Sequence, residues 1–165
     1  MSLADLKHGG LYVILFIRHD PPVQDNFHWG LYLHDSESNG GTKYHIVKPG
    51  SGWITDHGNT LGVFKSFLLV GLFRIADVPA GWEGYVDQTI RSLDNRVNTP
   101  DITCKIWVFW VLELLKRESN GYTVLKCNDL PALEREIKNW GNAKAAGAAA
   151  NEQPRSLTAS RICGL

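Results

Sequence analysis

The sequence has no surplus of charge and no long apolar run. Lysine and arginine together number 17, as do aspartate and glutamate, and no dense basic run occurs, so we expect no nucleic-acid partner. The longest apolar stretch, Leu11 to Ile17, is far shorter than the roughly 20 residues of a membrane-spanning helix. Met1 to His8 lack the basic start and apolar core of a secretory signal. These absences predict a cytoplasmic protein without an integral membrane segment.

Cysteine is also scarce, and its positions exclude two common uses. The three residues, Cys104, Cys127 and Cys163, are odd in number and far apart, unlike a disulfide framework or a zinc knuckle. No cofactor is expected, and no metal site is assigned. Zinc held by Cys104, His28 and His45 stays open as an alternative, although the sequence offers no evident fourth ligand or activating carboxylate.

The hydrophobic pattern changes once along the chain. Before Pro79, β-branched and aromatic segments bounded by turns predict four or five strands, the first over 11–17. After Trp82, apolar residues recur at helical spacing. We therefore predict an α+β fold in which helices pack on an antiparallel sheet of about five strands. Residues 1–140 are expected to form a single catalytic-type domain, and residues 141–165 a flexible tail rich in alanine and glycine.

Candidate chemistry lies in residues 27–34, which alternate in the manner of a strand with one buried face. His28 and Gly30 share the second face, and a glycine within a strand often marks a close approach by another group. We expect that group to be Cys104. A polar turn over 35–41 then returns the chain, which predicts that His45 lies on a neighbouring strand.

Cys104 is predicted in the first turn of a helix capped by Asp101 or Thr99. The partial positive charge and free N–H groups of a helix start favour a thiolate and can stabilise an oxyanion. A thiol nucleophile also needs a base and a partner that orients this base. His28 and His45 have the chemistry for both roles.

These residues resemble a known group of enzymes. The segments His28-Trp-Gly-Leu-Tyr-Leu and Tyr44-His45-Ile-Val, followed by Cys104 at a helix start, are similar to the lecithin:retinol acyltransferase and phospholipase/acyltransferase group. The same His, His, Cys order occurs in the NlpC-type cell-wall peptidases, which are also circularly permuted papain-like thiol enzymes. The resemblance implies a permuted papain-like order, with Cys104 as nucleophile, His28 as base and His45 as the orienting third member.

The sequence thus predicts a thiol hydrolase or acyltransferase that forms an acyl-enzyme on an ester, thioester or amide. Gly30, Trp53 and Trp107 are the candidate substrate-binding residues. The partner would be a small-molecule or acyl substrate, and the acyl group, the acceptor and the oligomeric state stay open. An inactive papain-like binding or interaction module is the alternative, because Thr103-Cys104-Lys105-Ile106 stands where the acyltransferases have Asn-Cys-Glu-His.

Overall fold

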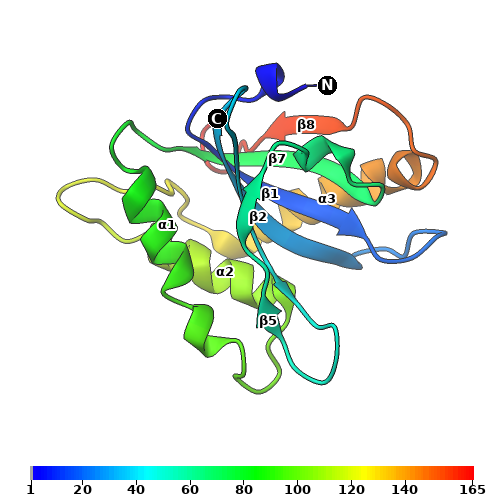
Figure 1. Ribbon diagram of the computed structural model, residues 1–165, viewed down its shortest axis with the longest axis horizontal. Coiled ribbons are helices and arrows are strands. Elements are labelled where there is room, and N and C mark those ends of the chain that lie inside the picture. Colours follow the sequence, from blue (N-terminus) through cyan, green and yellow to red (C-terminus); the bar gives the residue numbers. More distant parts are fainter. Residues whose placement is uncertain (1) are drawn as a thin grey trace.

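The computed structural model describes residues 2–165 and has an α+β architecture. Three helices accompany a mixed sheet of six strands and a separate pair of short strands (Figure 1). The strands are β1 (Gly10–Ile17), β2 (Phe27–Ser36), β3 (Gly40–Tyr44), β4 (Ile46–Val47), β5 (Ile54–Thr55), β6 (Gly58–Thr60), β7 (Leu69–Asp77) and β8 (Ser156–Ala159). The helices are α1 (Glu83–Arg91), α2 (Cys104–Leu115) and α3 (Leu130–Ala149), and 3₁₀ turns lie at Leu3–Asp5, Val63–Lys65 and Asp94–Arg96.

The main sheet has the order β6-β3-β2-β1-β7-β8. Its first five strands are antiparallel to their neighbours, as the sequence predicts, but β8 runs parallel to β7. The α+β class is therefore confirmed, whereas the sheet is mixed and has six strands. The difference arises because β8 lies far along the chain from β7, in a segment whose composition gave no strand signal.

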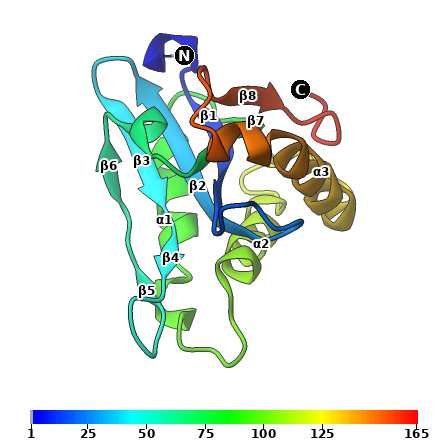
Figure 2. The ribbon, with the colours of Figure 1, turned by 90° about the vertical axis from the view of Figure 1, so that its right-hand side faces the viewer.

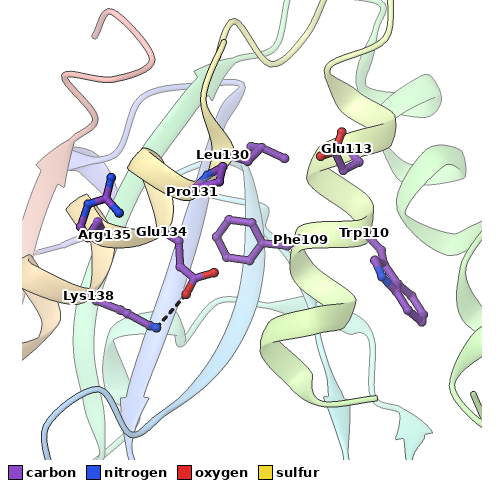
Figure 3. A pocket seen from close by; sticks show the side chains of 8 residues that line it. All are labelled: Phe109, Trp110, Glu113, Leu130, Pro131, Glu134, Arg135 and Lys138. Atoms are coloured by element: carbon purple, nitrogen blue, oxygen red, sulfur yellow. Dashed lines mark ion pairs between the residues drawn. The ribbon is translucent and has the colours of Figure 1, made fainter. Parts of the chain in front are cut away.

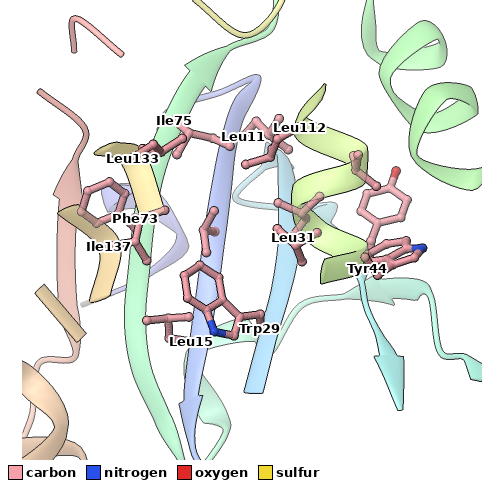
Figure 4. Packing of buried hydrophobic residues seen from close by; sticks show 14 of the residues in the cluster. Leu11, Leu15, Trp29, Leu31, Tyr44, Phe73, Ile75, Leu112, Leu133 and Ile137 are labelled. Carbon is pink, nitrogen blue, oxygen red and sulfur yellow. The ribbon is translucent and has the colours of Figure 1, made fainter. Parts of the chain in front are cut away.

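Strand β1 is buried on both faces because apolar layers cover both sides of the sheet centre. On one side α2 packs on β2 and α3 packs on β7, as Figure 2 shows. The larger core fills this layer, where Leu15, Trp29 and Leu31 meet Ile137 and other residues of the helices (Figure 4). A smaller cluster on the other side contains Tyr12, Ile14 and Phe16. The sheet centre is thereby fixed from both sides.

Residues 141–165, expected as a flexible tail, form part of the fold. Helix α3 continues to Ala149 and β8 joins the main sheet. The small residues serve close packing: a Cβ added at Gly141 would lie 2.8 Å from Leu15 Cδ1, and Ala145 and Ala148 are buried. Composition alone could not separate this tightly packed helix from a low-complexity tail.

Among residues 2–165, no helix combines the length and the apolar character needed to cross a membrane.

Candidate active site

Strand β2 positions the first candidate residue, His28. The alternation of the strand directs its neighbour Trp29 to the helices, where the indole meets Phe109 at a ring-centroid distance of 5.6 Å. The imidazole of His28 instead lies beside Phe16 on β1, with ring centroids 5.8 Å apart. His28 is consequently half-buried at the start of the strand.

Strand β3 pairs with β2 and ends at Tyr44, one residue before His45. This pairing brings His45 to His28. The Nε2 atom of His28 lies 2.8 Å from Nδ1 of His45. Gly30 makes room for this contact, since a Cβ there would lie 3.2 Å from His45 Cβ and 3.1 Å from the carbonyl oxygen of Tyr44. The close approach that the sequence predicts at Gly30 is therefore made by His45, Tyr44 and Ile14 rather than by Cys104. A role for Gly30 in substrate binding stays a prediction.

A carboxylate completes the contact between the two histidines. The Nε2 atom of His45 lies 3.0 Å from Asp56 Oδ2. Because a carboxylate accepts hydrogen bonds, Nε2 of His45 carries the proton and its Nδ1 is left to accept one from His28 Nε2. The Nδ1 atom of His28 then holds a free lone pair, and it has no hydrogen-bond partner in the described chain. Asp56, His45 and His28 thus form a hydrogen-bonded chain that ends in a base.

A second pair, His57 and Asp94, fixes the backbone of His45. The N–H of His45 donates to Nδ1 of His57 at 3.1 Å, so Nε2 of His57 is protonated and donates to Asp94 Oδ1 at 2.8 Å. The His57 ring lies between Tyr44 and Trp107, with centroid distances of 5.4 Å to each. His45 is therefore held through both its side chain and its main chain.

Burial keeps His28 and His45 neutral at pH 7. Desolvation, together with the smaller effects of the charges of His45, Arg18 and Lys43, lowers the pKa of His28 to about 4. The pKa of His45 is also lowered to about 4, because desolvation and then the charge of Lys43 outweigh the opposing effect of Asp56. At neutral pH the Nδ1 atom of His28 is thus available to take a proton.

Cys104 is the first residue of α2, as the sequence predicts. The helix is capped by Thr103, whose Oγ1 accepts a hydrogen bond from the N–H of Ile106 at 3.1 Å, rather than by Asp101 or Thr99. The Cys104 side chain lies in the larger apolar core at 2% exposure. In residues 2–165 no hydrogen bond links its thiol to His28 or His45. The pairing of Cys104 with His28 stays a prediction.

A cavity of about 410 Å³ opens beside the two histidines. Trp53, one of the candidate substrate-binding residues, lines this cavity together with His28 and His45. Trp107 is instead fully buried against His57, and its indole N–H has no hydrogen-bond partner in the described part of the chain. The structure therefore brings Trp53, but not Trp107, to the cavity of the histidines.

Sequence reasoning missed Asp56, His57 and Asp94. His57 reads as a loop histidine because it belongs to no periodic segment. The adjacent pair Asp56-His57, which directly follows the short β-rich segment Trp53-Ile54-Thr55, is the one signal that the sequence carries for this part of the site. Within the chain from residue 2 onward, no three side chains of His, Cys, Asp or Glu are grouped as a metal site, and the alternative zinc ligands do not meet as a set.

Comparison of the chain with protein-family models, with curated proteins and with solved structures finds no match.

Proposed function

We propose that the protein is a cysteine-dependent hydrolase or acyltransferase that works through an acyl-enzyme. The observation that carries the proposal is the hydrogen-bonded chain from Asp56 through His45 to His28, which leaves an unprotonated Nδ1 on His28. An imidazole that is neutral at pH 7 and is oriented by His45 can accept a proton, and a cysteine at a helix start suits a nucleophile. The order His28, His45, Cys104, which resembles that of permuted papain-like enzymes, supports the same roles.

The proposed reaction has two steps. The first step requires Cys104 to leave the apolar core on the helix side of the sheet, because His28 lies beside Phe16 on the other face of β2. His28 then takes the thiol proton, and Cys104 Sγ attacks the carbonyl carbon of an ester, thioester or amide to form a tetrahedral oxyanion. The oxyanion collapses to a thioester of Cys104, while the leaving group receives the proton from His28. His28 then takes a proton from water or from an acceptor hydroxyl, whose oxygen attacks the thioester. The acyl group leaves on this oxygen, and His28 gives the proton to the Cys104 thiolate. The free N–H groups at the start of α2 would stabilise both oxyanions.

A catalytically inactive binding module is the second candidate, and the burial of Cys104 favours it. The thiol is 2% exposed and surrounded by apolar side chains, which is the usual setting of a structural cysteine. An acyl donor reaches Cys104 only if its entry displaces part of this cover. The binding module needs no such movement, so the two candidates differ in whether Cys104 can be acylated.

Intact-mass spectrometry with activated thioesters, esters and amides tests the proposal. We expect one acyl adduct on the wild type, an unchanged adduct on the control Cys127→Ala, in which another buried thiol is removed, and none on Cys104→Ala. His28→Ala should acylate roughly a hundredfold more slowly, because general acid–base catalysis is lost.

The contrary results are equally specific. Equal acylation of Cys104→Ala and the wild type would contradict the assignment of the nucleophile. A folded wild type that is never acylated by the panel would favour the binding module. Circular dichroism of each variant establishes that the fold is retained before rates are compared.

A further inference from the structure

The cavity beside His28 and His45 is lined by three cations and by no acidic side chain. Arg18 and Lys48 are exposed at its rim, and Lys43 is half-buried on β3. Most of the other lining residues are apolar, including Phe16 and the half-buried Trp53. A concave site that combines an apolar wall with convergent cations is suited to a ligand of the same mixed character.

None of these three cations forms an ion pair in residues 2–165. In the groove between α2 and α3, by contrast, the lysines are paired: the carboxylate of Glu134 lies 3.0 Å from the ammonium of Lys105 and 2.7 Å from that of Lys138. Figure 3 shows the Lys138 ammonium directed at this carboxylate. Since the chain carries equal numbers of acidic and basic side chains, the excess of positive charge at the histidine cavity is a local arrangement.

The cations lie close to the cavity wall and to the base. The Lys43 ammonium is 4.8 Å from the centroid of the Phe16 ring, so it lies over the apolar wall. Burial lowers the pKa of Lys43, and the charges of Lys43 and Arg18 contribute to the low pKa of His28. Asp56, which lies near enough to raise the pKa of Lys43, is hydrogen-bonded to His45 and does not line the cavity. A positive charge that is partly desolvated and forms no ion pair favours an incoming anion.

We infer that this cavity binds an amphipathic anion, with its carboxylate or phosphate held by Arg18 and Lys43 and its hydrocarbon part on Phe16 and Trp53. Charge-assisted hydrogen bonds to such an anion are stronger than those between neutral groups. The inference rests on the proposed function only in identifying this ligand with the acyl substrate. It narrows the substrate to molecules that carry an anionic group beside an apolar chain.

Calorimetric titration of the Cys104→Ala variant measures binding apart from acyl transfer. The probes share one hydrocarbon chain: octanoate, octyl phosphate, octan-1-ol and octylammonium. We expect at least one of the two anions to bind about tenfold more tightly than octan-1-ol, octylammonium to bind most weakly, and added salt to weaken the anions only. The preference between octanoate and octyl phosphate identifies the anionic group.

Charge-removing variants locate the binding. Lys43→Gln and Arg18→Gln should each weaken binding of the preferred anion about tenfold. The controls Lys116→Gln and Arg117→Gln, which lie just after the C-terminal end of α2 and do not line the cavity, should not. Arg18 is exposed, so its variant tests the site even if Lys43→Gln fails to fold. Equal binding of octan-1-ol and both anions, or unchanged affinity in Arg18→Gln, would overturn the inference. If the anions bind but the wild type is never acylated, the inferred anion site is kept and the thiol chemistry is rejected. If the wild type is acylated but shows no preference for anions, the thiol chemistry is kept and the anion site is rejected.

Discussion

The backbone N–H of His45 donates a hydrogen bond to Nδ1 of His57 across 3.1 Å. One histidine thus places another, and each is bonded through Nε2 to its own carboxylate, Asp56 or Asp94. A ring held at both nitrogens keeps one tautomer and one orientation. His28 has a hydrogen bond at one ring nitrogen only, to His45. Its orientation consequently depends on Asp56, His57 and Asp94, none of which lines the cavity.

Removing the charge of Asp56 should slow acylation of Cys104 by roughly tenfold, because the amide of Asp56→Asn can present a donor to His45 Nε2 and destabilise the required tautomer. The side chain of Asp56 is 65% exposed, so water replaces part of the lost contact and the effect should stay below that of His28→Ala. Asp20→Asn, another exposed carboxylate close to β1 in sequence, serves as the control. Equal rates for the wild type and Asp56→Asn would show that the carboxylate does not act on the base.

Replacing His57 by leucine should destabilise the protein by about 1–3 kcal/mol, because the N–H of His45 loses its acceptor in a buried setting. His57→Asn should recover part of this free energy, since the Asn amide oxygen can accept the same hydrogen bond. Urea unfolding gives the free energies, and the ¹⁵N shifts of the His45 ring report its tautomer. A purely packing role for His57 would leave these shifts unchanged and would make the two variants equal in stability.

Stability should fall as the pH is lowered below about 6.5. Burial first, and neighbouring charges second, lower the pKa of His28 and His45 to about 4 in the folded state. Between these values the unfolded chain binds protons that the folded chain does not, so the stabilisation is complete above pH 6.5 and declines towards pH 4. We expect a loss on the order of 2 kcal/mol from pH 7 to pH 5 for each of the two histidines. Urea unfolding at both pH values checks the loss, which should shrink in the double variant His28→Gln, His45→Asn.

Adding a methyl group at Gly71 should disturb the pairing of β7 with β8. A Cβ at this position would lie 2.2 Å from the backbone carbonyl oxygen of Ser156 and 2.9 Å from Trp140. Because a backbone atom of β8 has to move, we expect Gly71→Ala to lower the free energy of unfolding by about 1–3 kcal/mol. The control Gly84→Ala, in α1 with open space around it, should stabilise by up to about 1 kcal/mol. Thermal unfolding of both variants decides whether β8 is held as tightly as the contacts indicate.

Local patterns predicted the parts of the fold that depend on local sequence. The alternation in residues 27–34 identified β2, and the helical spacing after Thr103 identified α2 with Cys104 in its first turn. The turn over 35–41 predicted the hairpin that brings His45 to His28. In each case, the signal and the structure that it specifies lie within a few residues of one another.

Long-range relationships could not be predicted in this way. Asp94 follows α1 in a 3₁₀ turn, and nothing near it in sequence indicates a contact with His57. Strand β8 is four residues long and half-buried throughout, so it shows no clear period of two. Its position follows from the packing of α3 on the sheet, which depends on small residues such as Gly141. Such residues carry little hydrophobic signal, although their lack of volume is what permits the contact.

The parallel partner of β7 has a consequence for biosynthesis. All three helices lie between β7 and β8 in the sequence, so the ribosome completes β7 well before it makes the strand that covers this edge. Until then the nascent chain presents an apolar strand with unpaired N–H and C=O groups. Such an edge can pair with another chain. The requirement for chaperone protection should therefore be greatest while α1, α2 and α3 are being translated, and it should end when β8 docks.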